Sequence, residues 1–105
     1  MGRFVIVAYR PKPGMAAALD ALVDKHCRVL AQEGLITDRV PYTMKAKDGT
    51  VVEVFEWASQ AAIEKAHTNA AVGALWAEFG AACDYVPLSQ LPETAQMFAE
   101  FDAIG

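Results

Sequence analysis

Two segments of the chain carry large apolar side chains at both odd and even positions. The first is residues 3–9 (RFVIVAY) and the second is residues 51–57 (VVEVFEW). Both are rich in β-branched and aromatic residues, which favour strands. A strand in a sheet with one solvated face alternates apolar and polar residues, so a strand that is apolar on both parities is expected to be covered on both faces. We therefore predict two strands that are buried on both sides.

Two longer segments show the apolar spacing of helices. A helix is predicted from about Met15 to Glu33, because Gly34 stands just past its end. The second helical segment follows Ser59, a good N-cap, and is interrupted at residues 68–69, where Asn69 can cap a second piece. The apolar stripes are Met15, Leu19, Leu22, His26, Val29 and Leu30 on the first helix, and Val72, Leu75, Trp76, Phe79 and Cys83 on the last piece.

Shorter strands complete the predicted order. Asp48-Gly49 separates residues 40–45 (VPYTMK) from residues 51–57, which predicts a tight antiparallel hairpin. Residues 84–88 (DYVPL) predict a last strand. The order strand, helix, strand, strand, helix, strand is the split βαβ arrangement of ferredoxin-like α+β domains with an antiparallel sheet.

This order predicts a partner for the sheet. Two helices cover one face of a four-stranded sheet, so the second face needs a cover from outside the chain. A second copy of the chain is the economical cover, through a two-fold interface. We expect a homodimer in which two sheets face one another as a β-barrel with the helices outside. Residues 1–105 form one domain, whose C-terminal tail (residues 89–105) packs on itself or on the partner because it is too apolar to be left in water.

Charge and composition narrow the partners and the compartment. The net charge is −4 and the nine Lys and Arg residues are scattered, so the basic patch of a nucleic-acid-binding protein is missing. The apolar run in residues 4–9 is too short for a signal-peptide core or a membrane span. We expect a cytoplasmic protein in which Cys27 and Cys83 are free buried thiols, with a disulfide as the minor alternative.

The sequence resembles a known family over nearly its whole length. The residues that carry the resemblance are VVEVFEW, the downstream Ala66-His67, Asn69 and VGALW (residues 72–76), and the closing YVPL, LPE and F-x-x-F. They are similar to the antibiotic-biosynthesis-monooxygenase-like (ABM-like) group of dimeric α+β barrels. The resemblance implies that barrel and its dimerisation. This chain departs from the family pattern at Asn69-Ala70, where similar sequences often have Asn-Pro.

For function the resemblance implies a range of activities. The superfamily is implied to include cofactor-independent quinol or polyketide oxygenases and haem-degrading enzymes. Haem degradation is implied to need an Asn on the first strand with a Trp and then a His on the second helix, whereas this chain has Ala8 on the strand and carries His67 before Trp76. No His, Cys or carboxylate has a recognisable metal-binding spacing either. We therefore expect no metal and no cofactor.

Three residues are candidates for catalysis. His67 and His26 each lie on an apolar helical stripe, and either could act as a general acid or base near neutral pH in a cavity between helices and sheet. Glu56 could be a buried carboxylate beside one of them. The alternatives stay open: a core imidazole bonded to a backbone carbonyl, and a Glu56 that pairs with Arg10 or with a partner residue at the barrel rim.

Aromatic side chains supply all but one of the candidates for ligand binding, and Asn69 is the exception. Flat ligands are held by stacking, although aromatic residues at these spacings are more often part of a core. The candidates are Trp76, Trp57, Phe55, Tyr9, Asn69 and Phe79.

Two functions fit these residues. The first is an oxygenase without metal or flavin, in which a histidine deprotonates a small phenol or quinol and the anion reacts with O₂. The second is a non-catalytic dimeric module that binds a small apolar molecule or serves a structural role. An open cavity that contains an imidazole favours the first, and a cavity plugged by Trp76, Phe79 and the C-terminal aromatic residues favours the second.

Overall fold

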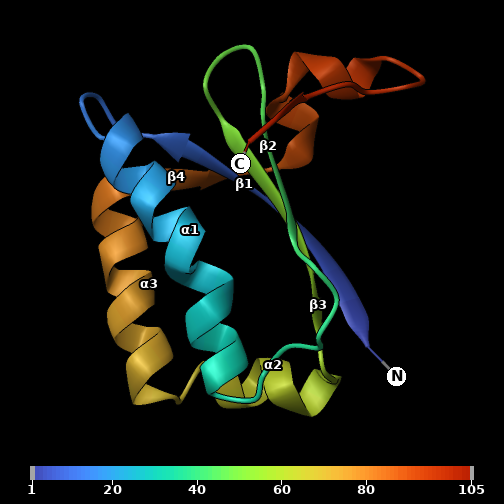
Figure 1. Cartoon of the computed structure of the whole chain (residues 1–105). Helices are drawn as coiled ribbons and strands as arrows, with labels where there is room; N and C mark the ends of the chain where they lie inside the picture. The colour runs from blue at the N-terminus through green and yellow to red at the C-terminus, as the bar shows by residue number, and fades with distance from the viewer. Residues whose placement is uncertain (1, 105) are drawn as a thin grey trace.

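A five-stranded antiparallel sheet forms the centre of the computed structural model, which describes residues 2–104 (Figure 1). Met1 and Gly105 of the predicted domain lie outside the described residues. The strand order is β4-β1-β3-β2-β5, so the two strands with apolar residues on both parities, β1 and β3, lie in the interior of the sheet. The strands are β1 (Arg3–Pro11), β2 (Tyr42–Lys45), β3 (Val51–Trp57), β4 (Cys83–Val86) and β5 (Asp102–Ala103).

Three helices accompany the sheet. They are α1 (Ala16–Gln32), α2 (Gln60–Ala66) and α3 (Ala70–Ala82). Helices α1 and α3 lie side by side on one face of the sheet, and α2 lies at the end of the sheet where β3 finishes (Figure 1). The predicted α+β class and the βαββαβ order are confirmed, and β5 is an addition at the edge beside β2.

The predicted helix boundaries follow from their caps. The side chain of Ser59 accepts a hydrogen bond from the backbone N–H of Ala62, and that of Asn69 accepts one from Val72, so the break between α2 and α3 is confirmed. Gly34 has a φ of 71°, which places it in the left-handed region that ends α1. No helix among residues 2–104 has the length and apolar character that crossing a membrane requires.

The register of β1 and β3 decides which residues face the helices. Ile6 lies opposite Val54 and Val7 opposite Glu53, so the odd-numbered residues of both strands share one face. This inner face packs on the helices: Tyr9 and Val51 are buried against Phe79 of α3. The even-numbered residues form the outer face.

Half of the outer face is covered by the chain itself. Residues 87–104, called here the C-terminal segment, turn back through η1 (Leu88–Gln90) and η2 (Pro92–Ala95) over one end of the sheet. Leu91 is 1% exposed and packs against Ala8, Ala46 and Val52. The tail therefore packs on its own chain, and the other half of the outer face is left uncovered by the described residues.

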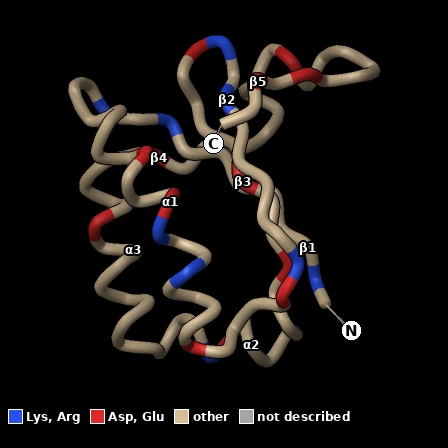
Figure 2. Tube along the Cα trace, in the orientation of Figure 1, with Lys and Arg blue, Asp and Glu red and all other residues tan. Residues whose placement is uncertain are grey.

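That other half carries exposed apolar side chains. Phe4, Ile6 and Tyr42 have exposed fractions of 59%, 52% and 67%. They are called here the outer patch, together with Val54, which lies between Ile6 and Tyr42 across the strands. Figure 2 shows Lys and Arg interspersed with Asp and Glu along the trace, so charge of one sign does not dominate the described chain.

Replacing Leu91 with Ala is expected to lower the free energy of unfolding by about 2–4 kcal/mol, because the change removes buried methyl groups and leaves a cavity over the sheet. Chemical denaturation followed by circular dichroism measures this decrease in the free energy of unfolding. Met97→Ala is the matched control: Met97 lies in the same segment but is 94% exposed, so its replacement should change stability by less than about 0.5 kcal/mol. Equal stability of the two variants would contradict the described packing of the segment.

Candidate functional site

A buried carboxylate stands at the centre of the inner face. Glu53 lies in the middle of β3 and is 1% exposed. Its Oε1 accepts hydrogen bonds from the Tyr9 hydroxyl at 2.7 Å and from His26 Nδ1 at 2.8 Å. Its Oε2 accepts a longer one from the Cys27 thiol at 3.6 Å. These three donors satisfy a group whose burial would otherwise be costly.

His26 is held in a defined orientation by this carboxylate. A carboxylate can only accept, so the bond to Glu53 places a proton on Nδ1 of the imidazole. In the neutral ring Nε2 then carries the lone pair, and its partner is the indole N–H of Trp76 at 3.4 Å. The ring also packs edge-on against Phe55 and Phe79, with centroids 5.5 and 5.0 Å away. The imidazole therefore presents a hydrogen-bond acceptor on the side of Trp76.

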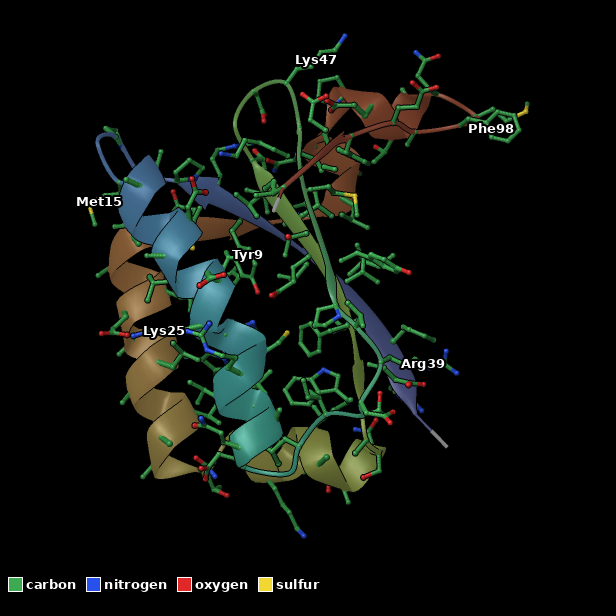
Figure 3. All side chains as sticks on the ribbon, in the orientation of Figure 1. Tyr9, Met15, Lys25, Arg39, Lys47 and Phe98 are labelled. Carbon is green, nitrogen blue, oxygen red and sulfur yellow. The ribbon has the colours of Figure 1, made fainter. Side chains whose placement is uncertain are left out.

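An open cavity of about 390 Å³ lies on that side of the imidazole. Two valines of β1 line it together with the aromatic residues Tyr9, Phe55, Trp57, Trp76 and Tyr85, and with His26. Figure 3 shows Tyr9 between the sheet and α1. Cavities of this size, mostly apolar with a few oriented polar groups, are typical binding sites for small molecules.

The other donors of the network keep their protons at neutral pH. Burial, and next the negative charge of Glu53, raise the pKa of Tyr9 far above its usual value. The same two causes raise the pKa of the Cys27 thiol. Burial also raises the pKa of Tyr85. The Tyr9 hydroxyl and the Cys27 thiol are therefore hydrogen-bond donors to Glu53, and neither is an activated nucleophile.

A second cavity of the inner face has a volume of about 280 Å³. Cys27 and Glu53 line it together with Asp20, Asp24 and Thr43. The hydrogen bond between Glu53 and His26 thus joins the linings of two cavities: Glu53 lines the partly acidic one and His26 the aromatic one.

The structure brings most of the predicted residues of the inner face together. His26, Tyr9, Phe55, Trp57 and Trp76 all line the aromatic cavity. Phe79 supports the His26 ring from the core and is fully buried. The cavity is open, and none of the described residues of the C-terminal segment lines it. Phe98 of that segment projects into solvent (Figure 3), and Ile104 packs against the inner core beside Tyr9 and Val51.

Three other candidates lie elsewhere. His67 is exposed at the C-cap of α2, with its ring centroid 5.3 Å from that of Trp76. Asn69 caps α3 and donates to Glu33 at 2.8 Å. Glu56 lies on the outer face and accepts from Arg39 at 2.7 Å and from Thr37 at 2.8 Å, so its ion-pair partner is Arg39 and not Arg10.

Sequence reasoning missed Glu53, the residue that joins the network. A signal was present in the strand itself: Glu53 shares its parity with Val51, Phe55 and Trp57, so it is a carboxylate on an apolar face. Such a residue needs buried hydrogen-bond donors, and Tyr9 of the same parity in β1 is one of them.

Comparisons of the chain with protein-family models, with curated proteins and with solved structures found no match.

Proposed function

We propose that the protein binds a small phenol or quinol in the aromatic cavity and catalyses its reaction with O₂, without a metal or an organic cofactor. One observation carries the proposal: the Glu53 carboxylate fixes the imidazole of His26 so that Nε2 offers a lone pair to an open, aromatic-lined cavity. A base held by a carboxylate on its other nitrogen is the arrangement that proton abstraction requires.

Substrate binding follows from the cavity lining. A flat ring gains stacking contacts from Trp57, Trp76 and Tyr85, and a volume of about 390 Å³ suits one to two fused rings. The contact between Trp76 and Nε2 is long at 3.4 Å, so a phenolic hydroxyl can replace the indole N–H as the donor to this nitrogen. Substrate and indole therefore compete for the same acceptor.

For a phenol whose para carbon bears a hydrogen, or a quinol with a free para position, the reaction gives a para-quinone. His26 Nε2 accepts the hydroxyl proton, and the phenolate donates electrons from its para carbon to O₂, forming a C–O bond. Loss of the para ring proton then breaks the O–O bond: one oxygen stays as the new carbonyl, and the other leaves as water with that proton and the one returned by His26. O₂ is the oxidant and the phenol the reductant, so no further electron carrier takes part.

Glu53 has a defined role in this reaction. When His26 accepts a proton, the imidazolium forms 2.8 Å from the carboxylate in a site from which water is largely excluded. The electrostatic attraction is stronger there than in water, so Glu53 stabilises the charge that develops during proton transfer.

We further propose a homodimer in which the outer patches of two chains face one another. Phe4, Ile6 and Tyr42 expose apolar side chains on one face of neighbouring strands, with the Arg39 guanidinium 5.5 Å above the ring of Phe4. Groups of exposed apolar side chains commonly mark contacts between proteins. A second copy supplies the same surface through a two-fold axis. Membership of the ABM-like group of dimeric α+β barrels is part of the same proposal, on the strength of the sequence resemblance.

The test uses the wild-type protein in the presence of a chelator. Phenols, naphthols and quinols are screened for an increase in melting temperature, since ligands that bind the native state stabilise it. Compounds that bind are then tested for O₂ uptake, and ¹⁸O₂ should place one labelled atom in the quinone. Binding without O₂ uptake would support the non-catalytic binding module instead. If no aromatic compound binds, the proposed function is wrong.

A further inference from the structure

We propose that His26, Cys27 and Glu53 form a binding site for one divalent transition-metal ion of the Zn²⁺ type, between helix α1 and strand β3. This inference does not depend on the proposed function, because it rests on the donor atoms alone. Helix α1 supplies the imidazole and the thiol, and β3 supplies the carboxylate.

The donor atoms are already gathered. His26 Nδ1 lies 2.8 Å from Glu53 Oε1, and Cys27 Sγ lies 3.6 Å from Glu53 Oε2. One ligand atom from each of the three residues lies within 4.8 Å of the others. Ligand atoms around tetrahedral zinc are roughly 3.3–3.8 Å apart at usual bond lengths. Shifts of about 1 Å or less would therefore open the site for an ion.

The chemistry of the donors selects the kind of metal. Imidazole nitrogen, thiolate and carboxylate together suit Zn²⁺ and Co²⁺, whereas Mg²⁺ and Ca²⁺ prefer oxygen ligands alone. Burial keeps the Cys27 thiol protonated, so binding must release this proton. Three protein ligands leave a fourth position for water from the partly acidic cavity.

Charge around the site favours a cation. Within residues 2–104 the only ion-pair partner of Glu53 is His26, so no Lys or Arg neutralises this buried carboxylate. The carboxylates of Asp20 and Asp24 border the same cavity as Cys27. They make long contacts of 3.4 Å with Lys45 and Arg28 at the surface.

Tyr9 completes the site as a supporting residue. Its hydroxyl donates to Glu53 Oε1, which leaves Oε2, on the side of Cys27, free to bind the ion. Hydrogen bonds of this kind orient metal ligands, and their loss usually weakens metal binding about 10- to 100-fold.

Metal and base exclude one another at His26. An ion on Nδ1 leaves the imidazole proton on Nε2, where the proposed oxygenase needs a lone pair. The metal-loaded protein should therefore lose oxygenase activity and regain it with a chelator. Metal binding itself is measured without substrate, so failure of the oxygenase proposal leaves this test intact.

The test is a titration of the reduced, metal-free protein with Co²⁺. Thiolate ligation should produce a sulfur-to-cobalt charge-transfer absorption that saturates at one ion per chain, and Zn²⁺ should abolish it. Cys27→Ser should remove the band, and Tyr9→Phe should weaken Co²⁺ binding by about 10-fold or more. Cys83→Ser is the matched control, because this buried thiol bonds to the Phe79 carbonyl outside the site.

Each variant is first checked for a cooperative thermal transition, and Cys27→Ala replaces Cys27→Ser should the latter not fold. Absence of the charge-transfer band in the wild type would overturn the proposal. So would an unchanged band in the Cys27 variant, or loss of the band in Cys83→Ser.

Discussion

Replacing His26 with Asn is expected to lower the turnover of an active phenol by about 10²- to 10⁴-fold, the range that general-base catalysis contributes. The base would be absent, while the aromatic lining that binds the ring would remain. The effect should therefore appear in kcat, with a much smaller change in the affinity for the substrate. Steady-state O₂ uptake and a binding titration with the same phenol measure the two quantities.

Two companion variants sharpen this test. In Glu53→Gln the amide oxygen can still accept from Tyr9 and from Nδ1, but the negative charge that stabilises the imidazolium is lost, so a smaller decrease in turnover than in His26→Asn is expected. His67→Asn is the control, because the exposed His67 is the only other histidine and lies outside the aromatic cavity. Full activity of His26→Asn, or loss of activity only in His67→Asn, would show that His26 is not the base.

Replacing Ile6 with Asp is expected to weaken the proposed dimer by about 10²- to 10³-fold, which corresponds to about 3–4 kcal/mol. Ile6 lies beside Val54 in the middle of the outer patch, so a two-fold interface would bury two like charges without partners. Sedimentation velocity over a range of concentrations measures the change. The side chain of Ile6 is half-exposed in the single chain, so the variant should remain folded.

The control for this variant is Phe98→Asp. Phe98 is 81% exposed and lies in the loop between η2 and β5, outside the outer patch. It projects into solvent (Figure 3), so its replacement should leave the dimer unchanged. A wild-type protein that sediments as a monomer at micromolar concentration would contradict the dimer proposal. Equal dissociation by both variants would place the interface on the C-terminal segment and not on the sheet.

Local chemistry made the elements of the fold predictable. The Asp48-Gly49 pair predicts the hairpin between β2 and β3, and Gly49 has a φ of 92° there. Ser59 and Asn69 predict where α2 and α3 begin, because each side chain can accept from a backbone N–H three residues ahead. These signals depend only on neighbours in the chain, so they can be interpreted without knowledge of the packing.

The site could not be predicted in the same way, because it depends on contacts between residues that lie far apart in the chain. Apolar residues occupy both parities of β3, so alternation could not tell which parity faces the helices, and Glu53 was not recognised as the centre of the network. His26 and His67 each lie on an apolar helical stripe in the sequence, so the sequence alone did not show which imidazole is buried. Only the short length of α2, which ends before His67, separates the buried imidazole from the exposed one.

The C-terminal segment was ambiguous for a related reason. Phe98, Phe101 and Ile104 recur at every third residue, which suits neither a strand nor an α-helix. The segment forms two 3₁₀ turns and a two-residue strand, and its anchor on the sheet is Leu91. Its path is decided by the apolar surface beneath it, since the segment contains little regular structure of its own.

The position of β5 has a consequence for handling the protein. By pairing with Met44 and Lys45, β5 occupies the open side of β2, which would otherwise offer its backbone N–H and C=O groups to any extended chain. A version shortened to end at Pro87 would lose the pairing of β5 with β2, and it would also lose the Leu91 side chain that packs on Val52. Such a fragment would have an unpaired sheet edge next to an exposed apolar sheet face, and this combination favours the growth of fibrous aggregates.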